Sequence, residues 1–208
     1  MIRNDEAERL TREGMRLVAG IRAPHDPAAA AERFRQAAAM GHAVAANQLG
    51  AMLERGEGVA KSEREARTAY RIGAEAGLAI AQFNLAFLLH MGRGGPADPA
   101  QARRWYAAAA AQGEPTATLN LGILTARGEG GPRDVGEGYR LFERAAELGE
   151  AAAAFNLGMV HGGGHDVPVD FVAASRWFHR AAALDHPHAA AEIRKLAAVM
   201  SDGEREAV

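Results

Sequence analysis

Histidine is the residue type in this sequence that most clearly could bind a metal or take part in catalysis, because five of the eight histidines lie between positions 161 and 188. His161 and His165 are four residues apart, the spacing at which one helix presents two imidazoles to a metal ion. The residues between them are all glycine, so no rigid helix is expected to hold the pair. The other late histidines are His179, His186 and His188. We interpret the group as loop or partner-contact histidines and predict no metal site and no cofactor.

Residues for nucleophilic catalysis are equally scarce. The chain contains no cysteine, which excludes disulfides, thiolate zinc sites and thiol nucleophiles. Ser62, Ser175 and Ser201 lack the context of a nucleophile elbow, and no pair of carboxylates stands apart from helix-surface charges. The glycine-rich loops follow helical segments and lack the lysine of a phosphate-binding loop. The sequence therefore predicts a protein that is not an enzyme.

The net charge gives the chain as a whole no attraction to a nucleic acid or to an anionic membrane, and leaves a local charged patch open. Lysine and arginine total 24 and aspartate and glutamate total 26, for a net charge of -2 over 208 residues. Residues 1–9 are rich in charge, and no later stretch is long and apolar enough to span a bilayer. We expect a cytoplasmic protein without membrane insertion or nucleic-acid binding, or a periplasmic one if a leader has been removed.

The elements that position these side chains belong to an internal repeat with a period of 36 residues. A glycine column holds Gly41, Gly77, Gly113 and Gly149, with Asp185 in the next place; a leucine column holds Leu49, Leu85, Leu121 and Leu157; an aromatic column holds Phe34, Tyr70, Tyr106, Phe142 and Phe178. The columns predict one domain over 1–200, with units at about 5–41, 42–77, 78–113, 114–149 and 150–185 and a capping helix at 186–200. Residues 201–208 are expected to form a flexible tail.

Each unit has the pattern of two helices. Apolar residues recur at spacings of three and four between Ala81 and Leu89, as on one helical face. Gly92 ends this helix, Asp98 is the expected N-cap of the next, and Gly113 suits its C-terminus. The same N-cap position is held elsewhere by Asp26, Ser62, Asp134 and Asp170. The sequence therefore predicts helical hairpins, and an all-α fold.

Small residues indicate how the hairpins pack. The first helices carry a column of small residues made by Gly50, Ala86, Gly122 and Gly158. This column leaves a notch that we expect to receive the aromatic ring of the second helix. One hairpin cannot bury its apolar face alone, so neighbouring hairpins must stack. Glu13 stands in the leucine column, which fits a terminal unit with one solvated side.

Several of these motifs resemble a known repeat. They are Ala81-Gln82-Phe83-Asn84-Leu85-Ala86, Phe155-Asn156-Leu157-Gly158, the loops Gly56-Glu57-Gly58 and Gly92-Arg93-Gly94, and the helix from Ala102 to Ala109. They look like the Sel1-like repeat, a longer relative of the tetratricopeptide repeat. The resemblance covers nearly the whole chain and implies a right-handed α/α superhelix of about five units that serves as a scaffold or adaptor. The last unit departs from the pattern at Gly162-Gly163-Gly164-His165-Asp166.

By analogy with tetratricopeptide arrays, the first helices would line a concave groove that binds a peptide or helix of a partner protein. The columns facing it would be Asn47, Phe83, Leu119 and Phe155, and Ala51, Phe87, Ile123 and Met159. From the second unit onward these columns are apolar, as in an interaction surface. Phe83 and Phe155 would equally suit packing between units, so both interpretations are open. We expect a monomer or a weak homo-oligomer.

A polar column precedes the leucines and consists of Gln48, Asn84, Asn120 and Asn156. Its amides could hold the backbone of a bound peptide, or they could tie one unit to the next. The alternative function is hydrolysis, because a cysteine-rich branch of the family is described as β-lactamase-like. That branch depends on disulfides, which a chain without cysteine cannot form.

Overall fold

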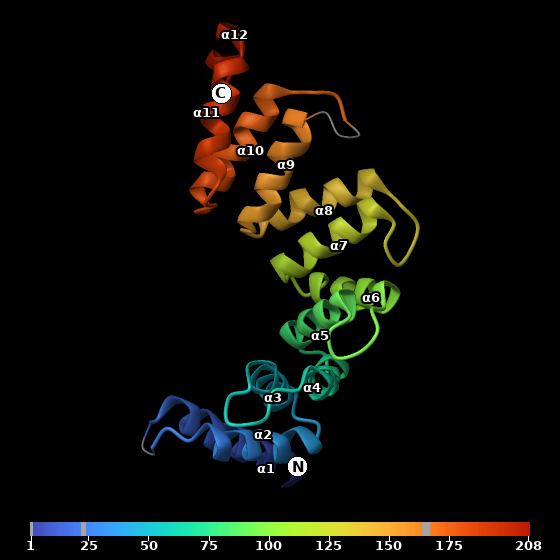
Figure 1. Cartoon of the computed structure of the whole chain (residues 1–208), viewed down its shortest axis with the longest axis vertical. Coiled ribbons are helices and arrows are strands. Elements are labelled where there is room, and N and C mark those ends of the chain that lie inside the picture. The colour runs from blue at the N-terminus through green and yellow to red at the C-terminus, as the bar shows by residue number, and fades with distance from the viewer. Residues whose placement is uncertain (1, 22–23, 164–166) are drawn as a thin grey trace. The chain divides into compact units, whose positions relative to one another are not determined.

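The computed structural model describes residues 2–21, 24–163 and 167–208 (Figure 1). The described residues form helices joined by turns and loops, and none of them lies in a strand. By its internal contacts the chain divides into two compact units, unit 1 over Met1–Gln112 and unit 2 over Gly113–Val208. The prediction of an all-α fold built from helical hairpins is confirmed. No helix in these ranges is both long and apolar enough to cross a bilayer.

Unit 1 consists of three helical hairpins. Its helices are α1 (Ile2–Ala19), α2 (Pro27–Ala39), α3 (Ala43–Arg55), α4 (Glu63–Glu75), α5 (Ala79–Met91) and α6 (Pro99–Ala110). Each odd-numbered helix packs against the helix that follows it, and α2 packs on α3 and α4 on α5. Successive hairpins therefore cover one another, as the repeat requires.

Unit 2 consists of two more helical hairpins, followed by two helices that do not belong to the repeat. Its helices are α7 (Pro115–Arg127), α8 (Val135–Glu147), α9 (Ala151–Gly163), α10 (Phe171–Ala183), α11 (Ala189–Val199) and α12 (Asp202–Glu206). The helix α11 packs on α10 within the range expected for a capping helix. In the segment 201–208, which the sequence predicts to be a flexible tail, Ser201 and Glu204 form a capping box at the start of α12. Arg176 also donates a hydrogen bond to the carbonyl of Ala207, which draws this segment to α10.

The second helix of every hairpin begins at the predicted N-cap. In each, the side chain of the cap residue accepts a hydrogen bond from the backbone N–H three residues further on, at 2.8–3.2 Å. These caps are Asp26, Ser62, Asp98, Asp134 and Asp170. Each satisfies a donor that the helix leaves unpaired, so the start of the helix is fixed by sequence.

The aromatic ring of the second helix lies in the notch of the first, as predicted. A methyl group added at Gly158 would lie 2.6 Å from the ring of Phe178, and one added at Gly50 would lie 2.6 Å from the ring of Tyr70. Because real methyl groups do not approach a ring so closely, glycine at these positions is required by packing. Phe178 and Tyr70 are accordingly buried.

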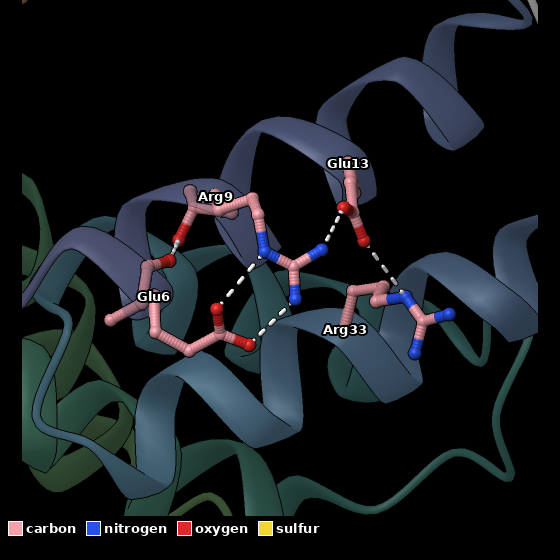
Figure 2. A network of polar contacts seen from close by, with 6 residues as sticks. Glu6, Arg9, Glu13 and Arg33 are labelled. Carbon is pink, nitrogen blue, oxygen red and sulfur yellow. Dashed lines mark hydrogen bonds and ion pairs between the residues drawn. The ribbon is translucent and has the colours of Figure 1, made fainter. Parts of the chain in front are cut away.

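Glu13, the charged residue in the leucine column, makes ion pairs in the first hairpin (Figure 2). Its carboxylate contacts Arg9 on α1 and the Nε of Arg33 on α2, the latter at 3.2 Å. Arg9 also pairs with Glu6, with its Nη2 2.6 Å from the Glu6 Oε1. Side chains that are a third or more exposed thus replace the apolar contact that leucine makes in later units.

Asp185 has the left-handed backbone conformation, with φ at 60°. Glycine occupies this column in the earlier units, with φ between 84° and 93°. Replacing Asp185 with glycine should raise the free energy of unfolding by about 0.5–1 kcal/mol, since a left-handed conformation strains residues that have a Cβ. Urea denaturation measures this change. Asp185→Ala is the control: if it is as stable as Asp185→Gly, backbone strain is not the cause.

Candidate functional site

Helix α5 in unit 1 is apolar on two faces. One face, which includes Ala81, Leu85, Leu88 and Leu89, is buried in the core. A second set, named the α5 stripe, consists of Ile80, Phe83, Phe87 and Met91. These positions follow one another at spacings of three and four, so they share a face of the helix. Ile80 and Met91 are exposed to 41% and 53%, and both phenylalanines are partly exposed.

The two phenylalanines of the α5 stripe contact each other and the core. The ring centroids of Phe83 and Phe87 are 6.4 Å apart with the rings stacked, and Phe83 lies 6.0 Å from Tyr106. Phe83 therefore packs against the core and also forms part of the exposed surface. Both interpretations of this residue, packing between units and lining of a groove, are compatible with this position. On the neighbouring helix α3, Val44 is 39% exposed and Ala51 is half-buried.

An amide pair joins α3 to α5. The Nδ2 of Asn84 donates a hydrogen bond to the Oδ1 of Asn47 at 2.9 Å. Both side chains are half-buried. The contact ties one hairpin to the next and supports the structural interpretation of the amide column at this position.

In unit 2 the corresponding residues are more involved in the core. Leu119, which the sequence predicts to face the groove, exposes only 6% of its surface and lies in a buried cluster with Phe142 and Leu157. Ile123 packs on the same cluster while remaining partly exposed. Met159 is 44% exposed on α9. Asn120 and Asn156 are half-buried.

Phe155 is covered on one side by histidine. The ring of His186 stacks on it at a centroid distance of 4.2 Å, and Phe178 lies 5.5 Å away on the core side. Burial, together with the neighbouring His188, lowers the pKa of His186, although Glu150 acts in the opposite direction. The lowered pKa favours the neutral form of His186, which packs on Phe155 as an aromatic ring.

The late histidines do not form one cluster, although the rings of His186 and His188 lie 5.9 Å apart. No group of three or more His, Asp or Glu side chains in the described ranges has the arrangement of a metal site. His161 is half-buried near the end of α9. His165 lies outside the described residues, as do the other two residues of 164–166, where the last unit departs from the repeat pattern.

The serines are engaged in helix structure. Ser62 and Ser201 cap α4 and α12. The Oγ of Ser175 lies 3.4 Å from the Nδ1 of His179, but that nitrogen is 2.9 Å from the backbone carbonyl of Ser175. A carbonyl only accepts hydrogen bonds, so this Nδ1 carries the proton and cannot act as a base toward the hydroxyl. These contacts give no support to the hydrolase alternative.

Comparison with protein families decides which repeat this is. The model of the Sel1 repeat matches residues 14–42, 43–78, 79–114, 115–150 and 151–186. The chain belongs to the Sel1 repeat family. Sel1 repeats generally mediate interactions between proteins. A search of the curated proteins found no match.

Solved Sel1 structures are similar to this chain. The protective antigen c5321 of uropathogenic Escherichia coli, which has an SLR fold, is 28% identical with a TM-score of 0.85 over 92% of this chain. The match spans only 41% of that protein. A Sel1 repeat protein from Oxalobacter formigenes is 26% identical with a TM-score of 0.83, over 88% of this chain and 75% of its own. The immunity protein Pa5087 of Pseudomonas aeruginosa shares the fold at 20% identity and a TM-score of 0.53, over 88% and 68% of the two chains.

A polar network that the sequence did not reveal joins two Sel1 repeats of unit 1. Arg93, in the loop after α5, contacts the carboxylates of Glu54 and Glu63 in the preceding hairpin at 3.1 and 2.6 Å. The Arg93 guanidinium lowers the pKa of Glu63. Glu54 also accepts a hydrogen bond of 2.6 Å from the buried hydroxyl of Tyr70. The loop comes close to the hairpin at Gly94, where a methyl group would lie 2.3 Å from the carbonyl oxygen of Glu63.

Proposed function

We propose that this chain is a non-catalytic protein-interaction module that binds an amphipathic helix or an extended apolar segment of a partner through the first helices of its repeats. The α5 stripe is the main contact surface in unit 1, with Ala51 and the Asn47–Asn84 pair beside it. In unit 2, Met159, Phe155 and Ile123 contribute a smaller surface.

The observation that carries this proposal is the second apolar face of α5. A surface helix of a folded protein usually has one apolar face toward the core and one polar face toward solvent. In α5 both faces are apolar, and Ile80 and Met91 on the second face are about half exposed. Exposed apolar side chains that lie next to one another on a helix mark interaction sites more often than solvated surface. Membership of a family whose repeats generally bind proteins adds support.

Phe87→Asp tests the proposal. After the partner is identified by affinity capture and mass spectrometry, calorimetry should show at least a tenfold loss of affinity, about 1.4 kcal/mol, because a charge is then buried in an apolar contact. Thr68→Asp places the same charge on an exposed position of α4 and should leave affinity unchanged. The circular-dichroism spectrum and the Tm should be nearly those of the wild type. Equal affinity of the two variants would remove the α5 stripe from the binding surface.

A further inference from the structure

Unit 2 contains a cavity of about 410 Å³ between α9, α10 and α11. Its walls are mostly apolar and include Gly158, Gly162, Phe171, Phe178, Leu196 and Val199. A cavity of this size, with apolar walls and few polar groups at its edge, has the character of a binding pocket.

The repeat explains why the space exists in this place. Gly162 occupies a column that holds Glu54, His90 and Ala126 in the preceding units. In unit 1, Glu54 fills the corresponding position and accepts a hydrogen bond from the hydroxyl of Tyr70. In unit 2, Gly162 has no side chain and Phe178 has no hydroxyl, so both groups that meet there in unit 1 are missing.

Packing does not require glycine at position 162. A methyl group added there would lie 3.6 Å from the Cβ of Ala174, which is an ordinary van der Waals contact. At Gly158, one turn earlier, a methyl group would collide with Phe178. The backbone at Gly162 has no positive φ, so its conformation does not demand glycine either. Packing therefore does not explain why position 162 is glycine, whereas a binding role for the cavity does, because a larger side chain would occupy it.

The charges at the edge of the cavity favour a cationic group. Glu192 and Lys195 form an ion pair of 2.7 Å, in which the glutamate side chain is 23% exposed and the lysine side chain 72%. Both residues line the cavity, but the lysine side chain extends into solvent whereas most of the glutamate side chain is covered. The last turns of α9 and α11 also border the cavity, and C-terminal helix ends carry partial negative charge. The N-terminus of α10 is nearby at Phe171, but Asp170 caps it.

The apolar surface continues outside the cavity. The cavity is open to solvent, and Met159 and Val199 at its wall are 44% and 63% exposed, so an occupant has further apolar contacts at the opening. We propose that this cavity binds a leucine or phenylalanine side chain of a partner segment in which lysine or arginine is adjacent. This inference rests on the proposed function, because Met159 belongs to both surfaces, and it adds the chemistry of the partner.

Methyl NMR of the full chain, with the signals of Leu196 and Val199 followed, tests the inference. The probes are the peptides acetyl-Gly-Lys-Phe-Arg-Gly-amide, acetyl-Gly-Glu-Phe-Asp-Gly-amide and acetyl-Gly-Lys-Ala-Arg-Gly-amide. The first should shift both signals saturably, and the other two should bind about tenfold more weakly. Glu192→Gln should weaken the first peptide about threefold or more, since the fixed carboxylate is lost.

Gly162→Leu fills the cavity and should abolish the shifts without lowering the Tm, and Gly162→Ala should weaken binding with the Tm equal or raised. Gly136→Leu is the matched control, because it makes the same change in α8 at an exposed site with no close neighbour on another helix. Equal binding of the acidic peptide, no saturable shift with the basic one, or full binding by a folded Gly162→Leu protein would overturn the inference. The Phe87→Asp variant tests only the α5 stripe in unit 1, whereas the peptide titrations test only the cavity in unit 2. A negative result for one hypothesis can therefore be distinguished from a negative result for the other.

Discussion

Phe178→Ala should lower the free energy of unfolding by about 3–5 kcal/mol. The ring is 3% exposed and lies against Gly158 in the notch of α9. It also contacts Phe155, with a centroid distance of 5.5 Å, and belongs to a cluster with Leu196. Alanine removes these contacts and cannot fill the notch, and the ring already borders a cavity that the substitution would enlarge.

Chemical denaturation monitored by circular dichroism measures the effect of Phe178→Ala. Ile80→Ala is the control, because Ile80 is 41% exposed and its truncation should cost less than about 1 kcal/mol. A loss below about 1 kcal/mol for Phe178→Ala itself would show that the ring does not hold α9 and α10 together.

Tyr70→Phe and Tyr106→Phe should change stability in opposite directions, although the two residues occupy the same column. Both are buried, and burial raises the pKa of both hydroxyls, which therefore stay protonated. Tyr70 donates its proton to Glu54 at 2.6 Å. The buried hydroxyl of Tyr106 has no hydrogen-bond partner among the described residues.

Removing the Tyr70 hydroxyl should cost about 1.5–3 kcal/mol, as expected for a hydrogen bond to a charged group. Removing the Tyr106 hydroxyl should add about 1 kcal/mol, because an unsatisfied buried polar group disappears. Denaturant titrations of both variants, compared with the wild type under the same conditions, provide the measurement. A destabilised Tyr106→Phe protein would mean that this hydroxyl has a partner, and a neutral Tyr70→Phe protein would mean that the hydrogen bond from Tyr70 to Glu54 does not stabilise the fold.

The helical hairpins were predictable because their signals are local. An aspartate or serine cap depends on a hydrogen bond to the third residue after it, and a glycine notch is matched by a ring in the next helix. Such features repeat every 36 residues and can be read from the columns. The packing of the late end of the chain was less predictable, since the hydrogen bond from Arg176 to the carbonyl of Ala207 has no counterpart in the repeat.

The candidate site was only partly predictable, because exposure depends on which side chains of neighbouring helices pack against a position. Leu119 and Phe83 share a column, yet the leucine is buried and the phenylalanine partly exposed. The bond between Asn47 and Asn84 joins two different columns, so periodicity alone does not reveal it. The network around Arg93 was missed for the same reason.

Intermolecular NOEs from the methyl groups of Ile80 and Met91, recorded in the complex with the captured partner, test the central claim most directly. These side chains are the most exposed members of the α5 stripe, and the buried Leu85 methyl groups of the same helix serve as an internal reference. If the second apolar face of α5 is the docking surface, both exposed methyl groups should show NOEs to apolar protons of the partner while Leu85 shows none. A saturated complex in which Ile80 and Met91 keep the chemical shifts of the free protein would contradict it.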